Sequence, residues 1–412
     1  MLAASRAGTL AASTVAAQFA SVALYWVAAR YVDPAEFGLF LASYGVAVLI
    51  VVSSDLGLSG LSVRELARDS LQAETYRSAF WAKSAIAFGS VALWSVGVLL
   101  IPDARARLPV EILAVYILAG MMTSSLLVPL RASQKMHLVG VATVIEKAFA
   151  LLIGYAGFRL WGAKPEVLPL AMAGGAIGAL GATIIMLPAP FRKLGSPSRV
   201  RMVTVLRQSV HFALANVASQ LQRLDVTVVL LVAGTQVAGV FGVPARISAA
   251  MGSLPNSLSW AMLPAAVESA VPEARRQAVV GVGALVLAFV LLFAFGILFA
   301  DSLVPILLGP KYSAAIPVMR IYLLGMILTV INQPRAAWLQ GAGQDRLVAA
   351  AVLSASVCGL VAIAVGARAY GAVGAAFGVI VLQVVAGLGL WIPWPHGRRG
   401  QPLAGARHVN DA

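Results

Sequence analysis

Apolar runs of about twenty residues recur from one end of the sequence to the other, and they constrain the fold more than any other feature. Each run has about the length that an α-helix needs to cross a bilayer. Of the 412 residues, 60% are hydrophobic and only 11% are charged, whereas a soluble domain is about half apolar and a quarter charged. We therefore predict an all-α polytopic membrane protein with about twelve transmembrane helices. The predicted spans are 10–30, 37–59, 79–101, 110–131, 140–161, 167–188, 210–233, 237–265, 278–300, 315–338, 346–367 and 371–392.

The basic residues are distributed unequally between the two faces that these spans define. Twenty of the thirty lysines and arginines fall at one face, Lys83 and Lys147 among them, and eight fall at the other. Positive residues concentrate in the cytoplasm, so we expect both termini to be cytoplasmic and the first apolar run to be an uncleaved helix. This sidedness accounts for the net charge of +14 without a nucleic-acid partner. Arg223 and Arg246 remain inside the predicted spans.

The sequence offers no residues for catalysis or for a bound cofactor. The single cysteine, Cys358, has no partner, and the four histidines are dispersed. No connection between spans is long enough for a soluble domain, and no phosphate-binding or nucleophile motif appears. The glycine-rich stretches 173–182 and 371–378 lie in spans, where small residues allow close helix packing. We therefore expect neither an enzyme nor a cofactor.

The two halves of the sequence resemble each other. Matching residues occur in the same order in both halves, at an offset that grows from 201 to 209 residues. The matching pairs are Gly38 and Gly239, Phe40 and Phe241, Tyr116 and Tyr322, and Arg159 and Arg368. Such order indicates an internal duplication.

The duplication predicts two lobes of six helices each. We expect an N-terminal lobe at 1–188, a basic cytoplasmic linker at 189–209, a C-terminal lobe at 210–392 and a cytoplasmic tail at 393–412. Because six is even, both lobes have the same orientation, which is the parallel-repeat design of alternating-access transporters. A duplicated channel or a structural bundle is the alternative.

A polar stripe lies along the first span of each half, at equivalent positions. Their residues are spaced by three or four, which places them on one face of a helix. A polar face on a spanning helix is expected to line the bundle interior or a wet cavity, because a charge facing lipid costs about 2.5 to 3.5 kcal/mol even on lenient scales. The stripes comprise Thr14, Gln18, Ser21 and Tyr25 in the first half and Asn216, Gln220, Arg223 and Thr227 in the second.

The intramembrane charges predict an anionic substrate. Arg223 replaces the serine of the first stripe, and Arg246 lies in a proline-interrupted span. We assign substrate binding to Arg223, Arg246, Gln18, Asn216 and Gln220. The alternative is that Arg223 pairs with Asp225 or with an acid on a neighbouring helix and only fixes packing.

Two acids and three further arginines complete the candidate site residues. Asp225 and Asp55 lie deepest in the spans and are candidates for coupling to an ion gradient, although capping or a local turn suits Asp55 better. Basic residues at the cytoplasmic face attract anionic headgroups. We expect Arg64, Arg131 and Arg335 to guide a headgroup toward the cavity.

Three segments resemble Wzx-type polysaccharide flippases. Residues 29–68, "ARYVDPAEFGLFLASYGVAVLIVVSSDLGLSGLSVRELAR", contain the P-x-x-F/Y-G turn and a second helix that ends in D-x-G. Residues 219–264, which begin "SQLQRLDV", resemble the seventh and eighth helices, and residues 307–344, "LLGPKYSAAIPVMRIYLLGMILTVINQPRAAWLQGAGQ", resemble the G-x-x-Y turn and the tenth helix.

The resemblance implies membership of the superfamily that also holds MATE multidrug exporters and lipid II flippases. It implies a flippase of the bacterial inner membrane that moves undecaprenyl-pyrophosphate-linked oligosaccharide to the outer leaflet by alternating access. Membrane lipids, a polysaccharide polymerase and glycosyltransferases would be its partners, and a proton or sodium gradient would be its energy source. The alternatives are a cation-coupled MATE-like exporter of small molecules and a membrane glycan polymerase or ligase.

Overall fold

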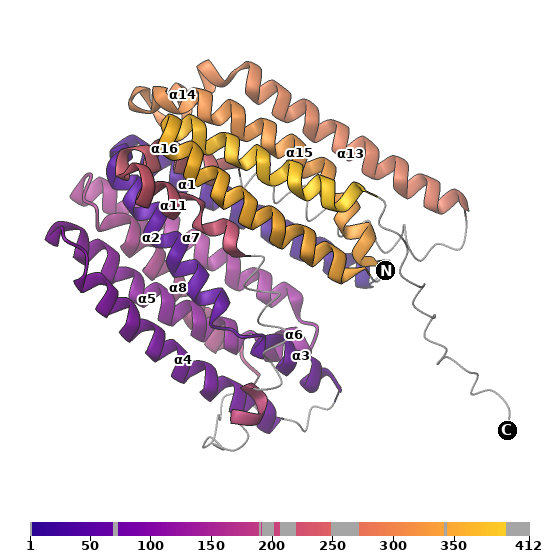
Figure 1. Cartoon of the computed structure of the whole chain (residues 1–412). Helices are drawn as coiled ribbons and strands as arrows, with labels where there is room; N and C mark the ends of the chain where they lie inside the picture. The colour runs from indigo at the N-terminus through magenta and orange to yellow at the C-terminus, as the bar shows by residue number, and fades with distance from the viewer. Residues whose placement is uncertain are drawn as a thin grey trace, which may run out of the picture.

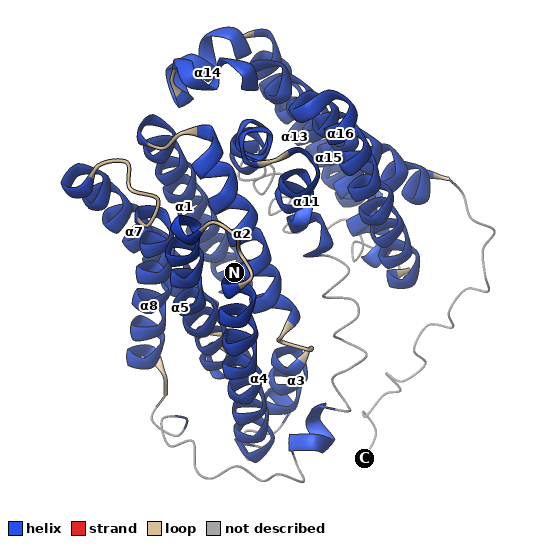
Figure 2. Ribbon diagram, turned by 60° about the vertical axis from the view of Figure 1, so that its left-hand side comes forward, coloured by secondary structure: helices blue, strands red, loops and turns tan. Residues whose placement is uncertain are grey.

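The described part of the chain is almost entirely helical. The computed structural model describes residues 2–68, 73–188, 191, 202–206, 220–248, 272–341 and 344–392. These residues contain helices and short connections and no strand (Figure 2). The predicted all-α polytopic fold is therefore confirmed.

The first half of the chain forms one bundle, drawn in indigo to magenta in Figure 1. Its two most extensive helix–helix interfaces join α7 to α8 and α7 to α1, and α5 packs on α2, α4 and α8. The elements are α1 (Leu2–Tyr31), α2 (Pro34–Ser53), α3 (Leu58–Arg68), α4 (Ala73–Leu99), α5 (Ala104–Leu126), α6 (Val128–Ala132), α7 (Met136–Trp161) and α8 (Val167–Met186).

The second half forms another bundle, in which α15 packs between α13 and α16. α16 is two helices across a sharp break, because Tyr370 leaves helical geometry and Gly371 has a φ of 61°. The elements are η1 (Leu221–Leu224), α11 (Asp225–Ala233), a helix at 235–248, α13 (Pro272–Leu298), α14 (Ala300–Leu308), η2 (Pro310–Ala315), α15 (Ile316–Gly341) and α16 (Asp345–Trp391).

The membrane spans agree with the apolar runs of the sequence. Nine described helices are long and apolar enough to cross a membrane, and the last of them, Arg346–Trp391, covers the two predicted spans 346–367 and 371–392. The predicted spans 210–233 and 237–265 fall only partly within the described residues, as does the linker 189–209, and the tail 393–412 lies outside them. The chain is a multi-pass membrane protein.

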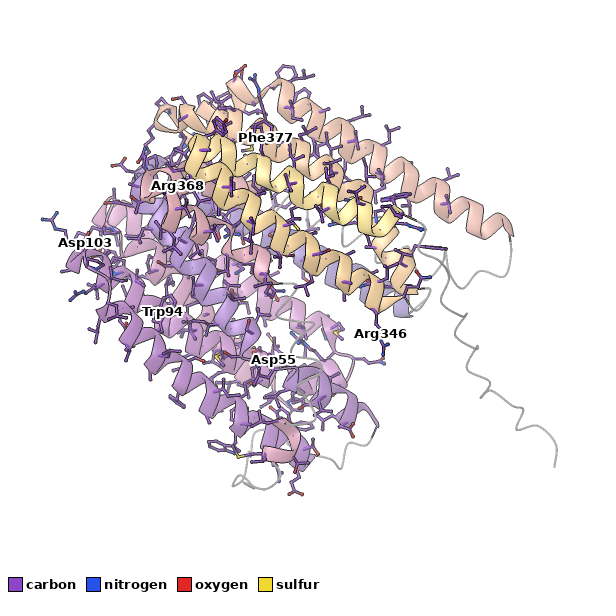
Figure 3. All side chains as sticks on the ribbon, viewed as in Figure 1. Asp55, Trp94, Asp103, Arg346, Arg368 and Phe377 are labelled. Atoms are coloured by element: carbon purple, nitrogen blue, oxygen red, sulfur yellow. The ribbon has the colours of Figure 1, made fainter. Side chains whose placement is uncertain are left out.

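Residues predicted for the same face lie at the same end of the molecule. Figure 3 shows Asp103, between the third and fourth predicted spans, and Arg368, between the last two, at one end of the molecule. Arg346, at the start of the eleventh predicted span, lies toward the other end. At the first end the bundles also touch: a terminal nitrogen of Arg30 donates to the carbonyl oxygen of Ile306 (3.0 Å), and Lys311 lies 3.5 Å from Asp33.

The two bundles meet where the duplication aligns Gly38 with Gly239. α2 crosses the helix at 235–248 so closely that a Cβ on Gly38 would collide with the backbone of Gly239, and one on Gly239 would collide with the carbonyl of Pro34. Equivalent residues that touch each other lie on a symmetry axis, so the predicted duplication would place a pseudo-two-fold axis at this crossing.

About two turns after Gly38 and Gly239 on the same helices, the aligned positions carry different residue types. Gly45 aligns with Arg246 at the offset of 201, and a Cβ on Gly45 would lie 2.7 Å from the carbonyl oxygen of Arg223 and 3.5 Å from a terminal nitrogen of Arg246. The first half thus contributes a glycine where the second contributes a guanidinium. The absence of a side chain at Gly45 is what leaves room for the cation at the bundle interface.

The glycine-rich stretches serve close packing, as predicted. Gly366 and Gly374, on either side of the break in α16, would each collide with the backbone of the other if they carried a Cβ. Gly175 of α8 lies equally close to the backbone of α7 at Glu146. Small residues therefore hold neighbouring membrane helices together in both halves.

We expect Gly239→Ala to disrupt the bundle crossing, because the new methyl group has backbone on its far side and no flexible side chain to displace. Overpacking of this kind costs about 1 to 3 kcal/mol or more. The measurement is the thermal unfolding midpoint of the purified protein in detergent. Gly89→Ala in α4 is the control, since nothing lies within 4 Å of a Cβ there; equal midpoints for the two variants would contradict the tight crossing.

Candidate functional site

An ion pair lies at the bundle interface, between the start of α11 and the helix at 235–248. A terminal nitrogen of Arg246 lies 3.1 Å from Oδ1 of Asp225, and these side chains are only 15% and 9% exposed. The same nitrogen is 3.4 Å from the carbonyl oxygen of Arg223. The Nε of Arg246 is buried without a hydrogen-bond partner among the described residues, so one donor of this guanidinium is unused.

Arg223 is exposed, in contrast to Arg246. It does not form the ion pair with Asp225 that the sequence left open, because Asp225 pairs with Arg246. The Nε of Arg223 donates instead to Oε1 of Gln220. The guanidinium of Arg223 is therefore the accessible cation of the site, and the amide of Gln220 orients it.

The polar stripe of the seventh span is not a regular α-helix. Residues Leu221–Leu224 form a 3-10 helix, and α11 begins only at Asp225. Gln222 donates to the hydroxyl of Ser356 (3.1 Å), and Thr227 donates to the carbonyl oxygen of Ala42 on α2 (2.9 Å). A 3-10 turn brings residues i and i+3 into line, which explains the contact of Gln220 with Arg223. Asn216 lies outside the described residues.

The first half faces these cations with tyrosines. The hydroxyl of Tyr44 donates to that of Tyr116 (3.3 Å), and their rings are 5.1 Å apart. Tyr25, on the predicted stripe of α1, interacts electrostatically with both Arg223 and Arg246. Gln18, two turns before Tyr25, is half-buried in α1. Tyr25 therefore brings the first stripe within electrostatic range of the two arginines.

Sequence reasoning missed one charged pair near this interface. Lys147 was counted with the cytoplasmic face, but it is the twelfth residue of the 26-residue α7 and lies within a candidate membrane span. Its Nζ is 2.6 Å from Oε1 of Glu146, and it interacts electrostatically with Tyr25 and Tyr44. Its position inside the predicted span 140–161 was the signal that could have identified it.

An apolar pocket of about 320 Å³ lies beside the charged site. It is lined by residues of α2, α4, α5 and α11, including Trp94, Val46 and Thr227. Thr227 follows Arg223 by four residues, about one turn. Charged and apolar surfaces are therefore neighbours at the bundle interface, an arrangement that suits an amphipathic molecule.

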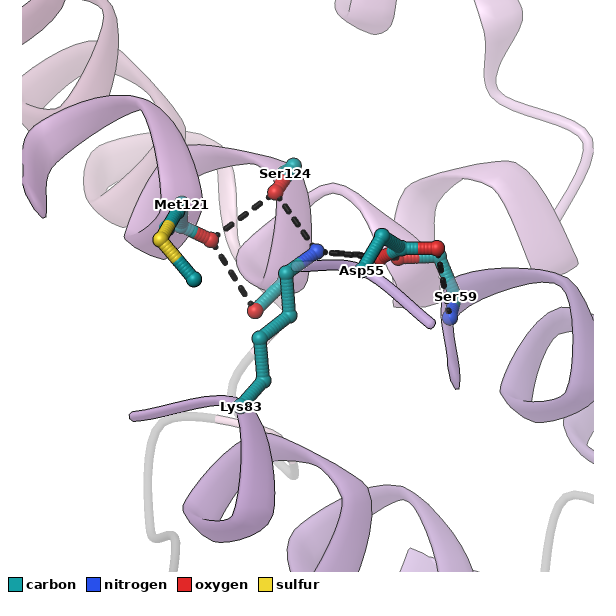
Figure 4. A network of polar contacts seen from close by, with 6 residues as sticks. Asp55, Ser59, Lys83, Met121 and Ser124 are labelled. Carbon is teal, nitrogen blue, oxygen red and sulfur yellow. Dashed lines mark hydrogen bonds and ion pairs between the residues drawn. The ribbon is translucent and has the colours of Figure 1, made fainter. Parts of the chain in front are cut away.

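A second buried network holds Asp55 in the first bundle (Figure 4). The Nζ of Lys83, only 2% exposed, contacts Oδ1 of Asp55 and donates to Ser124 (2.7 Å) and Ser59 (3.3 Å). Asp55 also accepts from the hydroxyl and backbone N–H of Ser59 at the start of α3. Lys83 is thus buried rather than at the cytoplasmic surface, and Asp55 has both the turn role and an ion pair.

The three arginines expected to guide a headgroup have different surroundings. The Nε of Arg335 donates to the carbonyl oxygen of Leu390 (3.1 Å), and its guanidinium lies over Trp338 and Trp391. Arg131 is half-buried in α6 and interacts electrostatically with Asp55. The side chain of Arg64 lies outside the described residues. Among the described residues, no group of His, Cys, Asp and Glu could hold a metal ion.

We expect Asp55→Asn to destabilise the protein strongly, because it leaves the buried ammonium of Lys83 without its counter-ion. Breaking a buried pair typically costs about 3 to 5 kcal/mol. The double variant Asp55→Asn, Lys83→Met should recover much of the loss in thermal unfolding, because it removes the unpaired charge as well.

Asp33→Asn is the matched control for that experiment. Asp33 pairs with Lys311 at the surface, where its side chain is 78% exposed, and an exposed pair contributes only about 0 to 1 kcal/mol. A loss for Asp33→Asn equal to that for Asp55→Asn would contradict the distinction between the buried and the exposed pair.

The fold is shared with transporters of known structure. An inward-facing multidrug resistance MATE family transporter of the MOP superfamily is 16% identical, with 92% of this chain and 93% of that chain covered and a TM-score of 0.69. The lipid II flippase MurJ in an inward closed conformation is 14% identical, with 95% and 87% covered and a TM-score of 0.71. An outward-facing MATE transporter gives 16% identity, 94% coverage of both chains and a TM-score of 0.60.

The sequence itself matches a family. No curated protein matches it significantly, but the family model for polysaccharide biosynthesis proteins matches residues 6–270. This range is more than half of the chain and includes α2, the bundle crossing and both interface arginines. The chain therefore belongs to the polysaccharide biosynthesis protein family and has the fold of MOP-superfamily transporters.

Proposed function

We propose that this protein is a flippase for a lipid-linked, anionic oligosaccharide. It would move undecaprenyl-pyrophosphate-linked repeat units from the cytoplasmic to the outer leaflet by a rocking motion of its two lobes. The family match and the fold support a flippase or transporter of the MOP superfamily, and the charges at the bundle interface support this substrate.

The observation that carries the proposal is the exposed cation of Arg223 at the bundle interface. Its neighbour Arg246 is already neutralised by Asp225, whereas among the described residues the side chain of Arg223 contacts only the neutral amide of Gln220. A diphosphate is a natural ligand for such a guanidinium, because charge-assisted hydrogen bonds to phosphate are strong. Gln18, Gln220 and Asn216 would bind sugar hydroxyls.

The apolar pocket supports a lipid substrate over a hydrophilic one. It adjoins the charged site through Thr227, so a headgroup at Arg223 would place its hydrocarbon chain near an apolar surface. A hydrocarbon chain beside this pocket would stay in apolar surroundings while the headgroup is bound, whereas a hydrophilic substrate would have no contact to make with this surface.

The contacts between the lobes support loading from the cytoplasm. At the end of the molecule predicted to face outward, the hydroxyl of Tyr312 donates to the carbonyl oxygen of Val32 (3.4 Å), and Arg30 and Lys311 bridge to the other lobe. The agreement with inward-facing relatives, at a TM-score of 0.69 against 0.60 for the outward-facing form, points the same way. Outward opening would break these three contacts.

The setting of the proposal is the inner membrane of a bacterium, with both termini in the cytoplasm. Membrane lipids surround the protein, and glycosyltransferases and a polymerase would act before and after it. Asp225 is the proposed link to a proton or sodium gradient, because neutralising it would release the guanidinium of Arg246 for the substrate. Asp55 suits coupling less well, since its charge is needed by Lys83.

A cation-coupled exporter of small molecules is the second candidate, favoured by the likeness to MATE transporters. The exposed guanidinium of Arg223 opposes binding of cationic drugs. A glycan polymerase or ligase would have to modify the oligosaccharide chemically. Purified protein that elongates or transfers a lipid-linked glycan would favour this third candidate.

We expect deletion of the gene to leave lipid-linked repeat units on the cytoplasmic leaflet, because the headgroup cannot cross hydrocarbon unaided. The measurement is the accessibility of the glycan to a soluble glycosidase in right-side-out and inverted membrane vesicles. Normal display of surface glycan in the deletion strain, in the absence of a second flippase, would refute the proposal.

We expect Arg223→Ala to lower transport by about tenfold or more while the amount of inserted protein stays unchanged, since Arg223 is exposed and a lost charge-assisted contact is worth about 1.5 to 3 kcal/mol. Surface glycan and membrane protein levels are measured together in the complemented deletion strain. If Arg223→Ala and Arg223→Lys both abolish insertion, Arg223 has a structural role and the assignment is wrong.

A further inference from the structure

We propose that Lys147 is the anion-binding residue of the N-terminal lobe, and that Glu146 is a resident counter-ion which the substrate displaces. The inference rests on the proposed function and deepens it: the substrate headgroup would bridge Lys147 on one lobe and Arg223 on the other. Such a headgroup needs two linked anionic groups, and a diphosphate has them.

The register of α7 against α1 places Lys147 beside the first polar stripe. The rings of Tyr31 and Phe158 stack 5.1 Å apart near the outer ends of the two helices, and a Cβ on Gly154 would meet the side chain of Leu24. The helices thus run parallel. Lys147 precedes Gly154 by seven residues, and Gln18 precedes Leu24 by six. Each of these separations is about 10 Å along the helix axis. Lys147 and Gln18 therefore lie at a similar depth.

The face of α7 that carries Lys147 is turned toward α1 and α8. Lys147, Ala150 and Gly154 are separated by three and four residues and so share one side of the helix. Ala150 packs on Gly175 of α8, and Gly154 packs on Leu24 of α1 and on Ala171 of α8. The side chain of Lys147 also interacts electrostatically with Tyr25 of the same stripe, and Tyr25 interacts with Arg223 and Arg246 of the other lobe.

The pairing of Lys147 with Glu146 is geometrically awkward. Consecutive residues on a helix do not face each other, so the 2.6 Å contact forms only because both side chains are long and bend sideways. They are 23% and 24% exposed. A lysine in this position can leave its neighbour for a better ligand without any movement of the helix.

The other buried lysine of the first bundle shows what a structural lysine requires. Lys83 is 2% exposed and contacts Asp55, Ser59 and Ser124 on other helical turns and helices. Among the described residues, the side chain of Lys147 has one polar contact, to its own neighbour in sequence. A charge inside a membrane span is costly and is a functional-site candidate by default, and the sparse contacts of Lys147 favour function over packing.

The test measures binding of two probes, undecaprenyl diphosphate and inorganic diphosphate, to the purified full chain in nanodiscs. We expect Lys147→Gln to weaken binding of both probes by about tenfold or more, because one charge-assisted contact is lost. Glu146→Gln should bind as tightly as the unchanged protein or more tightly, since it frees Lys147. Lys135→Gln, at the exposed start of the same helix, is the control and should bind normally.

Equal losses in Lys147→Gln and Glu146→Gln would show that the pair is structural and would overturn the inference, as would normal binding by Lys147→Gln. Failure of the unchanged protein to bind either probe would overturn it as well. Lys147-dependent binding of inorganic diphosphate without binding of the lipid would support the anion site and count against the lipid substrate. The two proposals can thus fail separately.

Discussion

The contact between the backbones of Gly38 and Gly239 is the constraint on which the rest of the structure depends. Membrane helices gain little from burying apolar surface against one another, so close backbone approach is what holds them together. Here two helices of different lobes approach closely enough for the backbones of residues that the duplication aligns to touch. The lobes therefore share this crossing, and the residues two turns away from it, Gly45 and Arg246, determine what lies between the lobes.

The charges inside the membrane fall into two groups that burial and contacts separate. Asp55 and Lys83 are enclosed by several partners, and Arg335 is held by a helix terminus and two tryptophans; these groups fix the fold. Arg223 is exposed and Lys147 is partly buried, and both have flexible, local partners. Arg246 with Asp225 is intermediate, because it is buried and paired but retains an unused donor. The more accessible cations therefore give the interface a positively charged surface.

Much of this architecture could be predicted from the sequence because it depends on patterns, such as long apolar runs and glycine-rich stretches, that are directly visible there. Span length and the close packing of glycines each have a simple physical cause. The contact between Gly38 and Gly239, which the duplication aligns, could be recognised only in the structure. The partners of the charges could not be predicted. Whether Asp225 pairs with Arg223 or with Arg246 depends on a 3-10 turn that no spacing rule revealed. Lys83 and Lys147 were assigned to the cytoplasmic face because a count of charges at each face does not consider how deep in its predicted span each lysine lies.

The central claim is that cations between two symmetric lobes carry an anionic lipid headgroup across the membrane. The most direct test is flipping by the purified protein in proteoliposomes loaded with a fluorescent undecaprenyl-diphosphate-linked oligosaccharide, whose leaflet is reported by a membrane-impermeant quencher. The account predicts rapid exchange between the leaflets and competition by the unlabelled lipid, but none by undecaprenol, which lacks the diphosphate. Exchange no faster than in protein-free liposomes, under every ion gradient applied, would contradict it.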